Sequence, residues 1–199
     1  MTDPAPERAP LIIAISGRPG SGKSVVAKRV AAELGLGHVS AGDFMRAMAA
    51  ERGLSILELS RLAEGDDAID AEIDARTVWL GTTGESFVID SRVAWFFLPK
   101  SVKVFLDVNT EVAAARIHAA LRPTERENVD LETTTRALIE RIESEASRYR
   151  RYYRVDYLDT DHYQIVIDTS ELSIEAVVTE LLRRLEAEPM DREGGSVAL

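Results

Sequence analysis

The chain has 199 residues, of which 45% are hydrophobic, and it carries 34 acidic against 24 basic residues for a formal net charge of −10. This length and composition suit one domain with a full hydrophobic core and exclude a largely disordered chain. The negative charge argues against nucleic acid and anionic membranes as partners, and the absence of cysteine excludes disulfide scaffolds, thiolate zinc sites and cysteine nucleophiles.

Both ends of the chain are polar and contain helix-breaking residues. Residues 1–10 include three prolines, and residues 188–199 include Pro189, Gly194 and Gly195, so we expect disordered tails on either side of a single domain at 11–187. Residues 1–10 lack the apolar segment of a signal peptide, and every apolar run is far shorter than the ~20 residues of a membrane helix. The sequence therefore predicts a cytoplasmic protein with no membrane partner.

Between the tails, short β-branched segments alternate with segments of helical periodicity. The expected strands are residues 11–16, 38–40, 86–90, 102–108 and 164–167. The expected helices are residues 23–34 ending at Gly35, a helix behind a Ser55–Glu58 capping box, residues 67–80, residues 111–120 capped by Thr110, residues 131–154 and residues 173–185. Parallel strands need crossover helices, so this alternation predicts an α/β three-layer sandwich around a five-stranded parallel sheet.

A glycine-rich segment lies between the first expected strand and the first expected helix. Its residues, Gly17-Arg18-Pro19-Gly20-Ser21-Gly22-Lys23-Ser24, match G-x-x-x-x-G-K-[ST] at every fixed position. The glycines let backbone N–H groups turn inward toward phosphate oxygens, the lysine reaches the β- and γ-phosphates, and the serine hydroxyl ligates Mg²⁺. A dinucleotide-binding fingerprint fits less well, because Val25 stands where a third glycine or alanine is expected. We predict a P-loop NTPase type of fold in which residues 17–25 bind ATP with Mg²⁺.

A carboxylate ends the third expected strand. Asp90 follows Phe87-Val88-Ile89, and the carboxyl ends of parallel strands lie at one edge of a sheet, beside the P-loop. This is the place for a second Mg²⁺ contact, made directly or through water. The alternative is that Asp90 only caps the end of its strand.

Several stretches together resemble nucleoside monophosphate kinases and, more closely, the cytidylate kinase-like family. They are the P-loop, His38–Arg46, Ile89–Arg92, Arg141–Glu145 with Arg148–Tyr149, and Ile167–Ser170. The resemblance spans roughly residues 11–185. It implies phosphoryl transfer from ATP to a nucleoside monophosphate, most closely CMP or dCMP giving CDP or dCDP. We expect a monomer or weak dimer.

The resemblance also implies roles for individual residues. A monophosphate is dianionic and needs fixed cations, and the resemblance assigns this task to Arg46 and Arg92. It assigns positioning of the acceptor to Ser40, Gly42 and Asp43. Residues 41–84 would form the acceptor-binding region, a strongly acidic stretch in which we identify no base-reading residue. A solvated helix face for Arg46 and a surface ion pair for Arg92 are the alternatives.

The region 116–154 carries nine arginines against seven acidic residues, in contrast to the acidic whole. Arg141 and Arg148 are seven residues apart and share a helical face, with Glu145 between them as an orienting partner. We interpret the region as a mobile lid whose arginines neutralise the transferring phosphoryl group and whose closure excludes water. An exposed arginine-rich helix is the alternative. By the resemblance, Arg116 stacks on the adenine of ATP.

Some features depart from the family pattern or leave alternatives open. Ser91 stands before Arg92 where the pattern has glycine, so a side chain crowds the backbone at the acceptor. The segment 93–97 either packs over the acceptor sugar or belongs to the core. The three histidines lack metal-ligand spacing. A P-loop kinase for another small acceptor and a non-catalytic nucleotide-binding module that switches conformation remain the competing functions.

Overall fold

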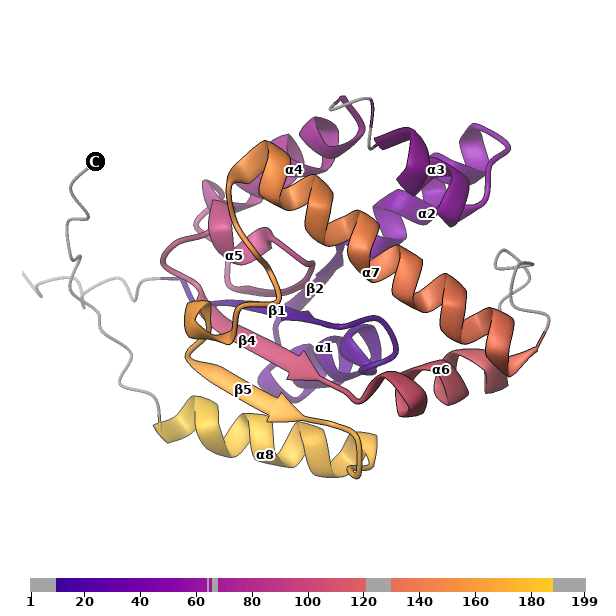
Figure 1. Ribbon diagram of the computed structural model, residues 1–199. Helices are drawn as coiled ribbons and strands as arrows, with labels where there is room; N and C mark the ends of the chain where they lie inside the picture. The colour runs from indigo at the N-terminus through magenta and orange to yellow at the C-terminus, as the bar shows by residue number, and fades with distance from the viewer. Residues whose placement is uncertain (1–9, 64, 66–67, 121–129, 188–199) are drawn as a thin grey trace, which may run out of the picture.

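A sheet of five parallel strands forms the centre of the computed structural model, which describes residues 10–63, 65, 68–120 and 130–187 (Figure 1). The strands are β1 (Ile12–Gly17), β2 (Gly37–Ser40), β3 (Phe87–Asp90), β4 (Val102–Asp107) and β5 (Ile165–Asp168), in the spatial order β2-β3-β1-β4-β5. Every neighbouring pair is parallel, so the carboxyl ends of all strands share one edge. The predicted fold class is confirmed.

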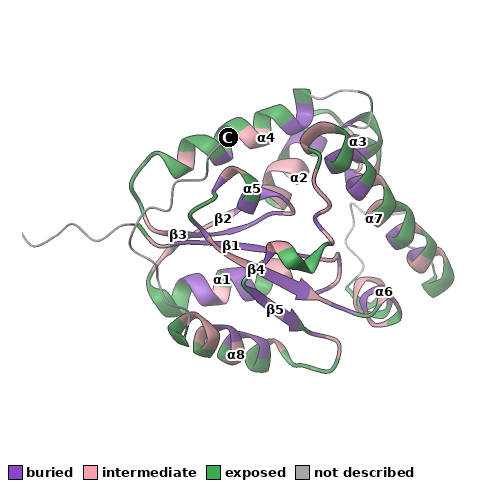
Figure 2. Cartoon of the chain, turned by 60° about the vertical axis from the view of Figure 1, so that its left-hand side comes forward, coloured by how far each residue is buried: buried purple, intermediate pink, exposed green. Residues whose placement is uncertain are grey.

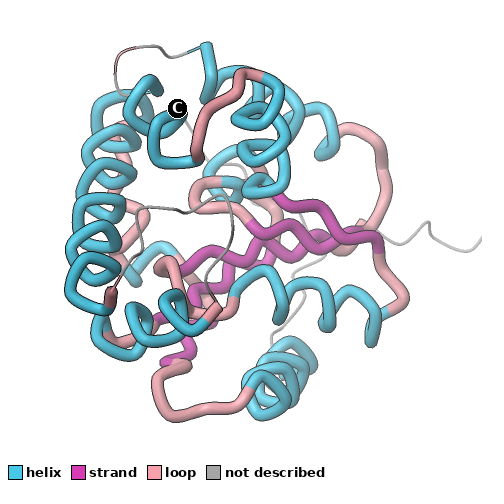
Figure 3. The backbone as a smooth tube through the Cα atoms, turned by 90° about the vertical axis from the view of Figure 1, so that its right-hand side faces the viewer, coloured by secondary structure: helices cyan, strands magenta, loops and turns pink. Residues whose placement is uncertain are grey.

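Helices connect the strands and lie on both sides of the sheet, as the rotated view in Figure 3 shows. In chain order they are α1 (Lys23–Leu34), α2 (Ala41–Glu51), α3 (Ile56–Ala63), α4 (Ala68–Gly81), α5 (Ala94–Phe97), α6 (Thr110–Ala119), α7 (Leu131–Tyr153) and α8 (Ile174–Ala187), with a short 3-10 turn, η1 (Thr160–His162). None of the described helices is long and apolar enough to cross a membrane.

The two faces of the sheet bury separate hydrophobic clusters. On one face, Ile13 and Ile15 of β1 pack with residues of α1 and α8. On the other face, Ile12 and Ala14 pack with α5, with α7 and with Tyr157, which follows α7. Successive side chains of a strand point to opposite faces, and burial on both faces explains why the central strand β1 is buried along its whole length and almost entirely apolar (Figure 2).

Two smaller hydrophobic clusters lie outside this sandwich. One joins α2, α3 and α4 through Met48, Leu59 and Ile69. The other joins α6 and α7 through Ala113 and Leu138. The first cluster lies within the region 41–84, which is expected to bind the acceptor. The second joins Leu138 of the expected lid region 116–154 to residues that precede this region. Residues 121–129, which include most of the polar lid segment, and both expected tails except Pro10 lie outside the described residues.

The local signals at helix ends were mostly interpreted correctly. Gly35 adopts the left-handed conformation (φ 66°) after α1, and the capping box is present: the Ser55 N–H donates to Glu58 at 2.7 Å, and the Glu58 N–H donates to Ser55 Oγ at 3.2 Å. The predicted cap at Thr110 is wrong. The side chain of Asn109 accepts from the N–H groups of Glu111 and Val112, and Thr110 is the first helical residue.

The segment 93–97 belongs to the core, and it contains the short helix α5, which the sequence did not predict. Val93, Ala94 and Trp95 are buried in the cluster on the α7 side of the sheet. The indole N–H of Trp95 donates to the backbone oxygen of Arg92 at 3.0 Å. This bond ties the core directly to a residue of the expected acceptor site.

Replacing Leu181 by alanine tests the packing of α8. Leu181 is 0% exposed and lies in the cluster with α1, so we expect Leu181→Ala to lower the free energy of unfolding by about 2–5 kcal/mol through lost burial and a residual cavity. Chemical denaturation measures the change. Leu172→Ala is the control: Leu172 is 36% exposed, and its loss is expected to cost under ~0.5 kcal/mol. Equal effects at both positions would contradict the packing described.

Candidate active site

The P-loop connects β1, in the middle of the sheet, to α1. Gly22 precedes α1 in the left-handed conformation (φ 80°). Gly20 is also left-handed (φ 82°), and a Cβ at this position would lie 2.7 Å from the Cβ of Ala113 in α6. Both the backbone angle and this close approach require glycine at position 20. The loop is thereby held against α6, with its N–H groups at the N-terminus of α1, where anions bind.

Asp90 lies next to the P-loop, as predicted from its position at the end of β3. Its side chain is 0% exposed; the hydroxyl of Ser24 donates to Oδ2, and Lys23 Nζ lies 3.6 Å from the same oxygen. Hydroxyl and carboxylate oxygens suit Mg²⁺, so Ser24 and Asp90 fit this ion. Nowhere in the described chain do three or more His, Cys, Asp or Glu side chains gather as a metal site. Such a pair therefore fits an ion that takes its other ligands from phosphates and water.

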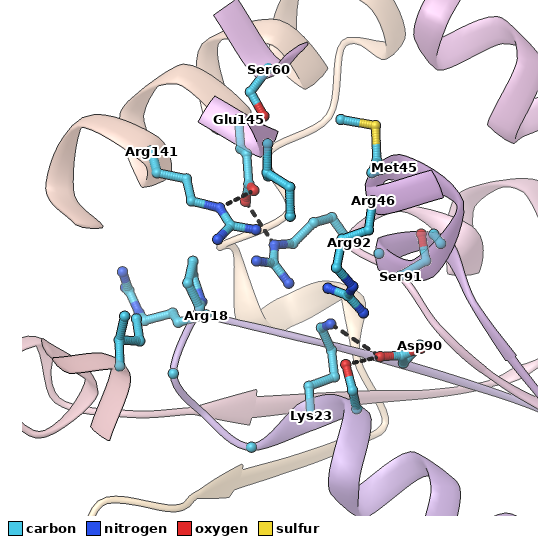
Figure 4. A pocket seen from close by; sticks show the side chains of 18 of the residues that line it. Arg18, Lys23, Met45, Arg46, Ser60, Asp90, Ser91, Arg92, Arg141 and Glu145 are labelled. Atoms are coloured by element: carbon cyan, nitrogen blue, oxygen red, sulfur yellow. Dashed lines mark hydrogen bonds and ion pairs between the residues drawn. The ribbon is translucent and has the colours of Figure 1, made fainter. Parts of the chain in front are cut away.

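A cavity of about 300 Å³ opens at the carboxyl edge of the sheet. The P-loop forms one wall, and α7 forms the opposite wall. Figure 4 shows the side chains of Arg46, Arg92 and Arg141 between these walls, on the side facing Lys23. The predicted residues that line the cavity are Arg18, Pro19, Gly20, Gly22, Lys23, Ser24, Val25, Gly42, Arg46, Asp90, Arg92, Arg116, Arg141 and Arg148.

A buried carboxylate holds two of these arginines. Glu145 of α7 accepts from Arg92 Nε at 2.7 Å and from Arg141 Nε at 3.0 Å (Figure 4). Burial alone would raise the pKa of Glu145, but the guanidinium groups of Arg92 and Arg141 outweigh it and lower the pKa to about 2. Glu145 is therefore ionised at neutral pH. It fixes the two guanidinium groups through one nitrogen each, which leaves their other N–H groups for a phosphate.

Arg148 lines the same cavity but is bound differently from Arg141. Its side chain is 2% exposed and forms an ion pair with Asp70 of α4 at 2.8 Å. It also donates to the backbone oxygen of Ser60 in α3 at 3.1 Å. Burial raises the pKa of Asp70, and the nearby Arg148 opposes this rise. The guanidinium thus joins α7 to α3 and α4, and a direct role in phosphoryl transfer stays a prediction.

Four predicted site residues are not among those that line the cavity. Ser40 caps α2 by accepting from the N–H of Asp43 at 3.3 Å, and Asp43 forms an ion pair with Arg46. Ser40 therefore stabilises the start of α2, and Asp43 holds the side chain of Arg46 one turn further along the helix. Gly17 is the last residue of β1, where a Cβ would lie 2.3 Å from the backbone oxygen of Leu106. Ser21 belongs to the turn of the P-loop.

Arg116 of α6, which the resemblance assigns to the adenine of ATP, lines the cavity. Its guanidinium donates to the backbone oxygens of Thr169 at 2.7 Å and Ser170 at 3.2 Å. Both acceptors belong to the loop between β5 and α8, within the matching stretch Ile167–Ser170. The guanidinium plane is thus fixed at the cavity wall, which suits stacking on a planar ring.

Sequence reasoning missed several residues of the site. Met45, Ile56 and Ser60 line the cavity on the α2–α3 side; helical periodicity alone marks them as ordinary core residues. The spacing of the histidines gives His38 of β2 no place in the site, yet its Nε2 lies 3.5 Å from Asp90 Oδ1. A sequence signal for this contact exists. His38 lies two residues before Ser40, on a strand expected to be parallel to the one that ends at Asp90.

Comparisons of the sequence with known proteins agree on one family. Residues 12–171 match the model of the cytidylate kinase-like family. A cytidylate kinase of Aeropyrum pernix is 42% identical over 161 residues, covering 81% of this chain and 91% of the relative. A cytidylate kinase of Methanothermobacter thermautotrophicus is 40% identical over 166 residues, covering 83% and 99%. Among solved structures, a shikimate kinase from Bacteroides thetaiotaomicron has the same fold, with a TM-score of 0.64, 18% identity and coverage of 88% and 98%.

The charge of Lys23 is sensitive to its surroundings. Its burial, and then the nearby positive charge of Arg92, lower the pKa of the ammonium group to about 8, although Asp90 and Glu145 oppose the shift. Above pH 8 the free protein therefore holds increasing amounts of neutral amine at this position. A bound triphosphate favours the ammonium form, so nucleotide binding in this range takes up a proton.

We predict proton uptake when ATP binds above pH 8. Calorimetric titrations at fixed pH in buffers of different ionisation enthalpy measure it; with a pKa of about 8 for Lys23, uptake is expected to rise from about a quarter of a proton at pH 7.5 to about 0.9 proton at pH 9. Lys23→Arg, which keeps its charge throughout, is expected to abolish the uptake, whereas Lys28→Arg in the same helix leaves it unchanged. Uptake that persists in Lys23→Arg would contradict the assignment.

Proposed function

The chain belongs to the cytidylate kinase-like family, and we propose that it transfers the γ-phosphoryl group of ATP to CMP or dCMP. The observation that carries the proposal is one cavity in which a phosphate-binding loop faces a second group of arginines, Arg46, Arg92 and Arg141. A protein that only bound a nucleotide would need the loop alone. A phosphotransferase needs both, because the acceptor phosphate must be held against the donor.

The donor side of the cavity binds ATP. The N–H groups of the P-loop and Lys23 hold the β- and γ-phosphates, and Arg116 supports the adenine. Ser24 and Asp90 hold Mg²⁺, which neutralises charge that develops on the phosphate oxygens. The position of Asp90, buried and in contact with both Ser24 and Lys23, supports this assignment.

The acceptor side is formed by the region 41–84. Arg46 and Arg92 bind the monophosphate, and the pair with Glu145 keeps Arg92 in place. Ala41, Met45 and Ile56 give this side an apolar wall, which suits the faces of a nucleobase. Ser91 is 7% exposed and lines the cavity, and its Oγ accepts from the N–H of Val93, so its hydroxyl proton remains available to an acceptor oxygen.

Transfer itself depends on position and charge. Arg141 and Lys23 face each other across the cavity and stabilise the negative charge on the transferring phosphoryl group. Closure of the lid region 116–154 removes water, which prevents ATP hydrolysis from competing with transfer. The carboxylate that contacts Arg92 and Arg141, Glu145, is ionised and engaged by both of them, which supports a mechanism in which Glu145 does not act as a carboxylic acid. A monomer or weak dimer in the cytoplasm stays a prediction.

A panel of acceptors tests the function. Initial rates of ADP formation with ATP and Mg²⁺ are expected to be highest with CMP or dCMP and low with UMP, AMP, GMP or shikimate. Lys23→Ala is expected to abolish turnover. Activity restricted to AMP or to a non-nucleotide acceptor would establish the alternative of another small-molecule kinase. Tight ATP binding with no acceptor-dependent turnover would establish the non-catalytic module.

Arg141→Ala separates charge stabilisation from binding. Loss of one preorganised cation is expected to lower kcat by about 10²–10³-fold with little change in the KM for ATP. Arg136→Ala is the matched control on the same helix, because Arg136 is exposed and pairs only at the surface with Glu132 in the described structure; its kcat should stay within about twofold of the parent. Steady-state kinetics with saturating acceptor measure both. A kcat of Arg141→Ala within twofold of the parent would exclude the role.

A further inference from the structure

The carboxylate of Asp90 has two oxygens in different surroundings. Oδ2 faces the P-loop, where it accepts from Ser24 Oγ and lies 3.6 Å from Lys23 Nζ. Oδ1 points to the other side, where Nε2 of His38 lies 3.5 Å away. The side chain is 0% exposed, so water does not solvate the second oxygen. The proposed function uses only Oδ2 and gives His38 no task.

Both atoms of the second contact lack any other partner. Asp90 Oδ1 and His38 Nε2 are each buried without a hydrogen bond among the described residues. A buried carboxylate oxygen without a donor is costly, and native structures rarely leave one so. The nearest available donor is the imidazole N–H, and a shift of a few tenths of an ångström brings the two atoms to hydrogen-bond distance.

The sheet explains why these two side chains meet. β2 and β3 are parallel neighbours, with Ser40 opposite Asp90 and His38 opposite Val88. His38 therefore lies one diagonal step from Asp90 on the adjacent strand. Its side chain is 21% exposed at the edge of the sheet, so the ring reaches inward from an edge strand to the end of β3.

We propose that His38 is a positioning residue for the Mg²⁺ site, an inference that rests on the proposed function of Ser24 and Asp90. The imidazole Nε2–H donates to Asp90 Oδ1, and this bond fixes the plane of the carboxylate. Because the two oxygens are rigidly connected, Oδ2 is then directed at Ser24 Oγ, the residue with which Asp90 would hold the ion. Outer partners of this kind orient metal-binding carboxylates and strengthen metal binding by 10–100-fold.

The experiment measures how much Mg²⁺ strengthens the binding of a non-hydrolysable ATP analogue, by calorimetry with and without the ion. His38→Leu, which keeps bulk but has no donor, is expected to reduce this strengthening by about tenfold or more while the metal-free affinity stays within about twofold. His38→Gln, whose side-chain amide can donate from the position of Nε2, is expected to keep most of it. His162→Leu is the control, because His162 pairs with Asp159 away from the cavity.

Other outcomes would overturn the proposal. A folded His38→Leu protein with an unchanged effect of Mg²⁺ excludes the positioning role. Equal losses of affinity with and without Mg²⁺ assign His38 a structural role only. If the leucine variant does not fold, His38→Asn replaces it: its amide is too short to reach Asp90, so an effect of Mg²⁺ as large as in His38→Gln refutes the proposal. This binding measurement involves no acceptor, so its result is independent of the acceptor panel. A panel without activity toward CMP or dCMP would refute the proposed function, whereas an unchanged effect of Mg²⁺ would refute only the role of His38.

Discussion

The arrangement of the active site depends on one buried anion, Glu145, between two arginines. Arg92 comes from the end of β3 and Arg141 from α7, and without a carboxylate between them the two guanidinium groups would repel each other beside Lys23. The same pairs lower the pKa of Glu145 to about 2, so the anion persists over the physiological range. One negative charge thus fixes two positive ones, and the cavity is preorganised for phosphate before a substrate arrives. The net positive charge that remains also contributes to the lowered pKa of Lys23.

Helix α7 connects this phosphate site to the acceptor region. Arg141 and Glu145 lie one turn apart and face the P-loop, whereas Arg148, almost one turn further on, pairs with Asp70 of α4. Near the end of the helix, the hydroxyl of Tyr153 donates to Asp74, one turn after Asp70. Two carboxylates of α4 therefore attach to α7, the helix that carries Glu145. These two contacts therefore connect α4, in the region 41–84, with the helix that carries Arg141 and Glu145.

The sequence predicted the parts of this protein that depend on local spacing and missed those that depend on tertiary contact. The P-loop and the position of Asp90 at the end of its strand follow from patterns within a few residues of each other, and the parallel sheet follows from the alternation of strand and helix patterns along the chain. Arg141 and Arg148 share a helical face, as predicted. That face meets the P-loop side of the cavity at Arg141 and contacts α3 and α4 at Arg148. Helical periodicity shows which residues share a face, but it cannot show which neighbouring element each of them contacts. His38 begins the stretch His38–Arg46 that resembles the family, but the resemblance gives it no role, and only the β2–β3 register brings it to Asp90. At the start of α6, Asn109 and Thr110 are both residue types that cap helices. In the structure Asn109 is the cap and Thr110 is the first residue of the helix.

The charge distribution explains how an acidic protein binds polyanions selectively. The net charge of −10 repels long polyanions, because they must approach a large area of surface at once. A mononucleotide needs only the mouth of the cavity, where Arg18, Arg46 and Arg141 lie together, and low-dielectric walls focus their field outward. Beyond one Debye length, about 8 Å at physiological salt, the surface acids no longer oppose these arginines. The contrast between the basic cavity and the acidic surface therefore favours small phosphates over long polyanions.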